Sequence, residues 1–171
     1  MCTIQDLFYV FEFSYVIKID VKLQINTPQE MVWDVISKTD NDPSYWKGIT
    51  SIRRISKDQN TVTREITLVN GSKCYQKVTL FPKEGIHIRW TRGPLVGIKD
   101  ILLTCNGNAS ILEVQMIYKL SGVVRLVPKS ILEELRFEAE QALQLIKEEV
   151  EKKLDKISTD GNLLRVDLIN E

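Results

Sequence analysis

Apolar and polar residues alternate one by one along much of the chain, a pattern typical of β-strands with one buried and one solvated face. The first such stretch is residues 15–25, where Tyr, Ile, Val and Leu occupy the odd positions. Apolar odd positions reach back to Leu7, and at about 3.3 Å per residue a strand from there would be roughly 60 Å long. Because one small domain cannot accommodate that length, we expect a bulge, a bend or an arm in residues 1–14.

A second region of alternation runs from residue 49 to residue 120 and is divided by turn residues. Asn70-Gly71 is the strongest turn signal, because a type I′ turn needs positive φ at both central positions. Successive short strands separated by such turns predict an antiparallel meander. The predicted strands are residues 49–57, 61–69, 72–81, 86–92, 98–105 and 109–120.

Helical spacing appears in two other parts of the chain. Residues 27–30, Thr-Pro-Gln-Glu, predict a capping box and a short helix, and Asp-Pro at 42–43 begins another short turn. From Leu132 to Ile157, apolar residues recur at spacings of three and four, opposite Glu and Lys. This stripe predicts a helix of about 27 residues, roughly 40 Å long. Only the concave face of the sheet can cover it.

The order of elements indicates one α+β domain in which a curved antiparallel sheet of about seven strands wraps around the long C-terminal helix, with two short helices after the first strand. We assign this domain to residues 15–157, after an N-terminal arm or strand extension (1–14) and before a C-terminal tail (158–171). The tail alternates at Leu164, Val166 and Leu168. Its sequence leaves open whether it is disordered or adds a strand.

This order of elements resembles the helix-grip fold of the START and birch-pollen-allergen superfamily, including its polyketide cyclase and coenzyme Q-binding branches. The resemblance is carried mainly by residues 25–33, Ile-Asn-Thr-Pro-Gln-Glu-Met-Val-Trp, and residues 45–52, Tyr-Trp-Lys-Gly-Ile-Thr-Ser-Ile. Members typically show a similar strand, capped helix, tryptophan and strand. The resemblance spans residues 15–157 and implies an apolar cavity between the sheet and the long helix. It names no ligand, because the fold hosts many unrelated ones and a few enzymes.

Alternation also predicts which side chains face that cavity. Arg64 and Arg92 share the inward faces and are suited to orient a carboxylate, phenol or phosphate, but pairing with an acid or reaching solvent is the favoured interpretation for both. We interpret residues 93–97, with a glycine at each end, as a movable loop near the cavity mouth or a plain tight connection. The predicted ligand-binding residues are Trp46, Arg64, Ile66, Gln76, Val78, Ile88, Trp90, Arg92, Val114, Met116, Tyr118, Leu135, Ala139 and Leu143.

Charge and composition exclude several classes of function. Lys plus Arg equals Asp plus Glu at 23 each, so no overall field attracts nucleic acid, and we expect no nucleic-acid partner. No window is long and apolar enough to span a bilayer, so we expect no stable membrane insertion. Cys2, Cys74 and Cys105 form no CxxC pair. They favour a reducing, cytoplasmic location, with Cys74 and Cys105 buried as small apolar residues.

Motifs for catalysis or cofactor binding are missing from the sequence. His87 is the single histidine and lies one residue off the inward register, so we predict that it faces solvent and that no zinc site exists. Glu65 and Glu113 are also predicted to face outward. The chain has neither a nucleophile elbow nor a P-loop. We assign no catalytic residue and expect no cofactor or metal.

Three functions compete at this point. The leading hypothesis is a carrier, sensor or chaperone that binds a hydrophobic small molecule, such as a lipid, an isoprenoid or quinone, or an aromatic compound. The first alternative is a polyketide cyclase or dehydratase type of enzyme, with proton transfer by Tyr118, Arg64, Arg92 or Asp100. The second is a protein–protein interaction module acting through terminal strands, which includes a homodimer formed through the N-terminal extension.

Overall fold

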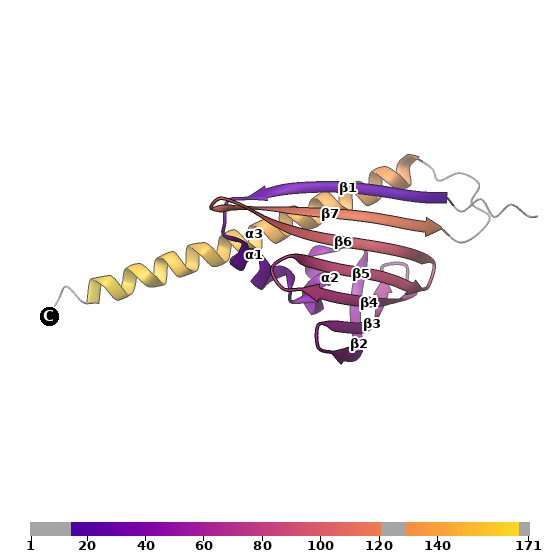
Figure 1. The fold of residues 1–171 in the computed structure, drawn as a ribbon, viewed down its shortest axis with the longest axis horizontal. Helices are drawn as coiled ribbons and strands as arrows, with labels where there is room; N and C mark the ends of the chain where they lie inside the picture. Colours follow the sequence, from indigo (N-terminus) through magenta and orange to yellow (C-terminus); the bar gives the residue numbers. More distant parts are fainter. Residues whose placement is uncertain (1–14, 121–128, 168–171) are drawn as a thin grey trace, which may run out of the picture.

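The computed structural model describes residues 15–120 and 129–167, and in that part the elements follow the predicted order (Figure 1). The predicted N-terminal arm and Cys2 lie outside the described residues. The elements are β1 (Tyr15–Ile25), α1 (Gln29–Ile36), the 3-10 turn η2 (Thr39–Asn41), α2 (Asp42–Tyr45), β2 (Ile49–Asp58), β3 (Thr61–Leu68), β4 (Lys73–Phe81), β5 (Gly85–Arg92), β6 (Leu95–Asn106), β7 (Ala109–Leu120) and α3 (Lys129–Asp167).

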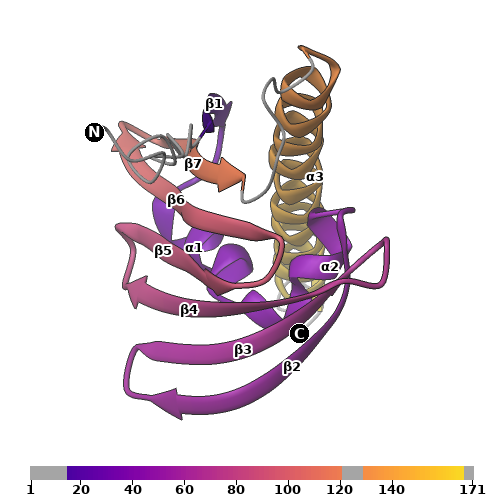
Figure 2. The ribbon, with the colours of Figure 1, turned by 90° about the vertical axis from the view of Figure 1, so that its right-hand side faces the viewer.

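The strands form one antiparallel sheet of seven strands in the order β1-β7-β6-β5-β4-β3-β2. Strands β2 to β7 are a meander, and β1 joins it at the far side by pairing with β7, so that β1 and β2 are the two edges. Figure 2 shows the sheet curving around α1 and α2, with α3 alongside them. This arrangement confirms the predicted curved sheet around a long C-terminal helix.

The concave face of the sheet carries the core, as the alternation predicts. In β1, Ile17, Ile19 and Val21 are buried while Lys18 and Lys22 are exposed. Burying one such aliphatic side chain stabilises the fold by about 1.5–3 kcal/mol. Helix α3 contributes buried residues at spacings of three and four, which are Ala139, Ala142, Leu143, Ile146 and Val150. It packs mainly on β1, α1 and α2.

Helix α3 extends past the predicted end at Ile157 and continues to Asp167. Its C-terminal half reaches beyond the sheet (Figure 1). The backbone of Leu164 and Val166 is therefore helical, not part of an added strand. No proline interrupts this segment, and each further helical residue adds a hydrogen bond once the helix is nucleated.

The predicted capping box at residues 27–30 is wrong. Helix α1 begins at Gln29, its N-cap is Pro28, and no side chain caps it. The Thr27 hydroxyl is buried and makes no hydrogen bond with the described residues. The Thr27 amide instead donates to the carbonyl of Ile25 at 2.8 Å. Because the helix starts later than predicted, Glu30 lies too early in it for the box and pairs with Lys83 at 3.1 Å.

Two further expectations need correction at the ends of β6. Cys105 is exposed, while Cys74 is buried as predicted. The interpretation of 93–97 as a loop is wrong for residues 95–97, because β6 begins at Leu95. Gly97 lies inside the strand with φ +155°, where a Cβ would come within 2.1 Å of the Ile117 carbonyl oxygen. The glycine therefore allows β6 to approach β7 closely.

Candidate functional site

An apolar cavity of about 200 Å³ lies between the sheet, the residues that follow α2, and α3. Most of its lining is aliphatic or aromatic, and its side chains with polar groups include Asn70, Lys99, Tyr118 and Glu138. Five of the predicted ligand-binding residues line it, namely Trp46, Trp90, Met116, Tyr118 and Leu135. The rest of the lining is Gly48, Ile49, Leu68, Val69, Asn70, Leu95, Lys99 and Glu138.

Most of the other predicted residues lie beside or behind the cavity wall. Five of them are buried in the core, and they are Ile66, Val78, Ile88, Val114 and Ala139. Leu143 is buried too, and it borders a separate, more polar hollow between β1 and α3. These residues are part of the core but not of the lining.

Arg64 is fully buried and all three of its guanidinium nitrogens are engaged by the protein. Its Nε donates to Gln76 Oε1 at 2.8 Å, its Nη1 to the Thr39 carbonyl at 2.7 Å, and its Nη2 to Asp42 Oδ2 at 2.5 Å. Asp42 is itself only 5% exposed. Arg64 therefore joins β3 and β4 to η2 and α2, and it does not line the cavity.

Arg92 and Asp100 do not face the concave side: the predicted inward position of Arg92 is wrong, and Arg92 reaches solvent, which was the favoured interpretation. A register shift between Tyr75 and Gln76 pairs Arg92 with Tyr75, over whose ring its guanidinium lies at 5.5 Å. Arg92 is exposed there. Asp100 Oδ1 and His87 Nδ1 lie 2.6 Å apart in a hydrogen bond, and both side chains are partly exposed. His87 is thus off the inward register, as predicted.

Lys99 is the functional candidate that sequence reasoning missed. Its residue is 2% exposed, and its Nζ lies 3.4 Å from the centroid of the Trp46 ring. Burial lowers the pKa of Lys99 to about 7; the charges of Asp42 and Glu138 oppose this shift and that of Arg64 adds to it. Within the described residues no carboxylate lies in ion-pair distance of Nζ. The observed register explains its inward position, since β6 pairs Lys99 with the inward Met116 of β7.

Three further groups give the cavity wall its polar character. Trp90 meets Tyr118 edge to face, with ring centroids 5.9 Å apart, and its buried Nε1–H has no hydrogen-bond partner among the described residues. Burial and the Glu138 charge raise the pKa of Tyr118, and a polar interaction of its phenol with the Trp90 Nε1–H, which falls short of good hydrogen-bond geometry, partly offsets the rise. Burial also raises the pKa of the half-buried Glu138. Its carboxylate rests against Gly48, where a Cβ would be 3.4 Å away.

Together these groups suit recognition of an apolar molecule with one polar end. The cavity supplies aromatic surface, an N–H donor without a partner among the described residues, a buried amine and a weak acid. No group of His, Cys, Asp and Glu in the described part of the chain is arranged to hold a metal ion. Nor does any helix in that part have the length and apolar character needed to cross a membrane.

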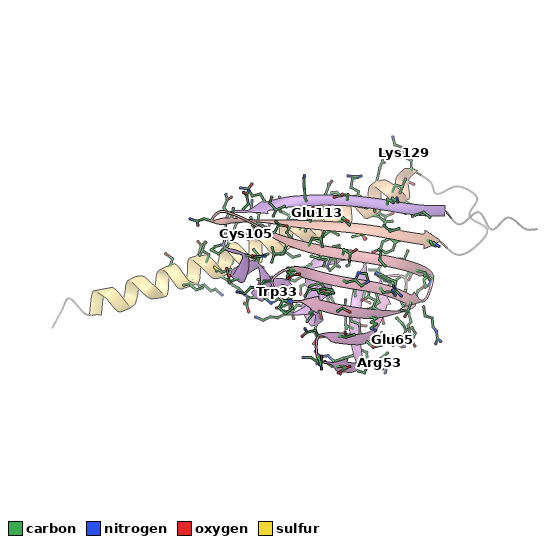
Figure 3. All side chains as sticks on the ribbon, viewed as in Figure 1. Trp33, Arg53, Glu65, Cys105, Glu113 and Lys129 are labelled. Carbon is green, nitrogen blue, oxygen red and sulfur yellow. The ribbon has the colours of Figure 1, made fainter. Side chains whose placement is uncertain are left out.

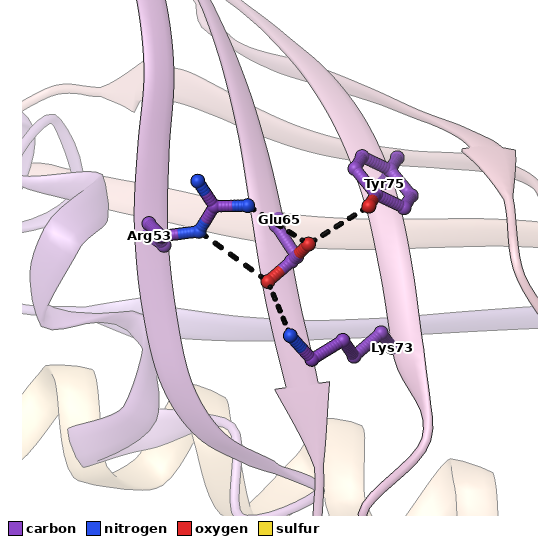
Figure 4. A network of polar contacts seen from close by, with 4 residues as sticks. All are labelled: Arg53, Glu65, Lys73 and Tyr75. Carbon is purple, nitrogen blue, oxygen red and sulfur yellow. Dashed lines mark hydrogen bonds and ion pairs between the residues drawn. The ribbon is translucent and has the colours of Figure 1, made fainter.

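The outer face of the sheet carries a separate polar cluster around Glu65, shown in Figure 4. Its carboxylate accepts hydrogen bonds from Arg53 Nη2 at 3.0 Å, Lys73 Nζ at 3.0 Å and Tyr75 Oη at 2.8 Å. These three partners lower the pKa of Glu65 to about 2. Glu65 is 6% exposed only because they cover it. Figure 3 labels Glu65 and Arg53 on neighbouring strands of this face. The cluster stabilises the sheet edge and does not touch the cavity.

We expect Glu65→Gln to lower the free energy of unfolding at pH 7. Because the folded-state pKa is depressed, the contribution of Glu65 is complete above its unfolded value of 4.5 and is lost as the pH falls toward 2. The difference from the unchanged protein should therefore shrink between pH 4.5 and pH 2. Urea denaturation at several pH values measures it, with Glu84→Gln in the exposed β4–β5 turn as the control. A difference that is constant with pH would contradict the assignment.

Comparison with solved structures shows the same fold. A protein from Thermus thermophilus, TTHA0849, superposes with a TM-score of 0.70 at 12% identity, over 80% of this chain and 98% of that one. The Zhui aromatase/cyclase from Streptomyces sp. R1128 gives a TM-score of 0.63 at 14% identity, over 82% and 96%. Ara h 8.0201 gives 0.64 at 13% identity, over 81% and 99%. No family model and no curated protein matches the sequence. The chain therefore has the helix-grip fold of the START and birch-pollen-allergen type.

Proposed function

We propose that the protein binds a small apolar molecule, aromatic or isoprenoid, with a hydrogen-bond acceptor at one end. The observation that carries this proposal is the apolar cavity with a buried Trp90 Nε1–H that has no partner among the described residues. A buried donor with no hydrogen bond of good geometry costs up to about 1–3 kcal/mol, and the Tyr118 phenol offsets part of that cost here. A ligand acceptor placed against it would recover that free energy.

The size of the cavity narrows the class of ligand. An apolar cavity of about 150 Å³ holds a single benzene ring, and this one measures about 200 Å³. It therefore suits a one- or two-ring aromatic compound or a short isoprenoid better than a whole lipid chain. The aromatic side chains Trp46, Trp90 and Tyr118 give such rings a large contact area. A carrier, sensor or chaperone role needs nothing more than this binding.

A second candidate is an enzyme of the cyclase or dehydratase type that uses the same cavity. It is favoured by Tyr118 and Glu138, two proton-bearing groups with raised pKa in the cavity lining. It is also consistent with the structural likeness to the Zhui aromatase/cyclase. Arg64, Arg92 and Asp100 lie away from the lining, so proton transfer would depend on Tyr118 and Glu138.

Filling the cavity should abolish binding without unfolding the protein. We expect the unchanged protein to bind 2-naphthol with a dissociation constant on the order of 1–100 μM, as is usual for so small a ligand. Leu135→Trp places an indole in the cavity from α3 and should weaken binding at least about tenfold, a loss of roughly 1.4 kcal/mol. Isothermal titration calorimetry measures both constants.

The matched control is Phe137→Trp, the same replacement two positions further along α3 at a side chain that is 57% exposed. It should leave the dissociation constant unchanged. Circular dichroism checks that both variants are folded. Equal affinities for Leu135→Trp and the unchanged protein would show that 2-naphthol binds elsewhere, and would contradict the proposed function.

A further inference from the structure

Lys99 is an unusual side chain for the position it occupies. It is the one buried lysine within residues 15–120 and 129–158, where the others are exposed or partly exposed. Its Nζ lies over the Trp46 ring, and no ion pair to it is found in the described part of the chain. A purely structural lysine would be expected to reach a carboxylate or solvent. Lys99 reaches neither a carboxylate nor the outer surface, since the residue is only 2% exposed, and it lines a cavity that a small molecule can enter.

Burial of this kind changes the chemistry of an amine. Desolvation favours the uncharged form, and only that form has the free electron pair that attacks a carbonyl carbon. The charged and titratable groups around Nζ are Asp42 after η2, Arg64 on β3 and Glu138 on α3, with the phenol of Tyr118 on β7 in the same cavity. The pKa of Lys99, lowered to about 7 by burial, leaves a large uncharged fraction at neutral pH. A surface lysine, with a pKa of about 10.4, has almost none.

We propose that Lys99 binds the carbonyl group of an apolar aldehyde or ketone covalently, as an imine. This inference rests on the proposed function, because the carbonyl compound must first occupy the same cavity. It narrows the ligand class from molecules with an acceptor group to molecules with a reactive C=O. The Trp90 Nε1–H is a suitable donor to the carbonyl oxygen, since it has no partner among the described residues.

The bonds and protons balance without any oxidant or reductant. Nζ attacks the carbonyl carbon, a C–N bond forms, and the C=O π electrons move to oxygen. A proton moves from nitrogen to that oxygen, which gives a carbinolamine. The carbinolamine hydroxyl then takes a second proton and leaves as water, and loss of the last nitrogen proton yields the neutral imine. Glu138 is suited to supply the proton to the leaving hydroxyl, because it lines the cavity and burial raises its pKa.

Reductive trapping tests this inference directly. The protein is incubated with 2-naphthaldehyde and sodium cyanoborohydride at pH 7, and the modified residue is located by peptide mass mapping. We expect one naphthylmethyl group per chain, on Lys99, attached at least about tenfold faster than on any surface lysine. Lys99→Arg should lose this adduct, while Lys119→Arg, at an exposed position on β7, should keep it.

A second ligand separates failure of this inference from failure of the proposed function. 2-Naphthylmethanol has the same rings but no carbonyl group, and its binding is measured by calorimetry. It should bind the unchanged protein and protect Lys99 from trapping, which also supports the assignment should Lys99→Arg fold poorly. Binding of the alcohol without trapping at Lys99, or with trapping spread over surface lysines, would overturn the imine site alone. Absence of binding by both compounds would overturn the proposed function, and the imine site with it.

Discussion

Replacing Asp42 by alanine should lower the free energy of unfolding by about 3–5 kcal/mol, because it leaves a buried guanidinium without its counter-charge. Arg64 has no exposed surface, and Asp42 Oδ2 lies 2.5 Å from its Nη2. Thr39 and Gln76 would still accept hydrogen bonds from the guanidinium, but both are uncharged. Since a domain is stable by only about 5–15 kcal/mol, this loss is large. Urea denaturation measures it directly.

Asp40→Ala is the matched control, two residues earlier in the chain. Asp40 pairs with Arg54 on the surface, where the side chains are 52% and 48% exposed. Such a pair contributes about 0–1 kcal/mol. The double variant Asp42→Ala, Arg64→Met should recover part of the loss, because it removes both charges and leaves an apolar side chain in the core. If Asp42→Ala proved as mild as Asp40→Ala, the guanidinium would have to reach water, contrary to its burial.

The Asp42–Arg64 pair also links the fold to the cavity. It fixes α2 against the inner face of β3, and Trp46 follows α2 directly. Trp46 then covers the amine of Lys99. The two charges of the pair act on the pKa of Lys99 in opposite directions, so together they change the electrostatics of the cavity less than either alone. A buried ion pair placed here therefore positions the aromatic wall without adding a net charge beside it.

Alternation identified the strands well because the sheet has one wet and one buried face. In β1 and β7, inward apolar residues are separated by mostly polar outward ones, so period and register coincide with the observed pairing. The stripe on α3 was equally direct, since Ala139, Leu143 and Ile146 are all buried. These local patterns, read in order, were enough to predict the helix-grip architecture.

The candidate site was harder to predict because the sequences of β5 and β6 do not show which of their side chains face the concave side. In β6 both faces carry aliphatic residues, such as the buried Ile101 and the exposed Leu102, so alternation does not show that Lys99 points inward. In β5 the bulge opposite Tyr75 and Gln76 turns Arg92 outward, and the local sequence gives no sign of this bulge. Periodicity also does not show which strand packs against a short helix, so the ion pair between Arg64 and Asp42 could not be predicted from the sequence.

Replacing Lys99 by methionine should stabilise the protein below neutral pH, by about 1–4 kcal/mol. The folded-state pKa of Lys99, about 7, lies below its ordinary value of 10.5, so between these pH values the unfolded chain binds more protons than the folded one. The destabilisation is therefore complete below pH 7 and disappears as the pH rises toward 10.5. The Trp46 contact stabilises the ammonium by about 2 kcal/mol when desolvated, which limits the gain from methionine.

Urea denaturation of both proteins at pH 6 and pH 9.5 measures this trend, with Lys119→Met at an exposed position as the control. The methionine variant should be more stable at pH 6, and its advantage should shrink at pH 9.5. Lower stability of Lys99→Met at pH 6 would show that the ammonium is well accommodated by Trp46, and would weaken the case for a nucleophilic amine. Higher stability together with loss of trapping would mean that Lys99 lowers stability while supplying reactivity, as expected of a functional group in an apolar cavity.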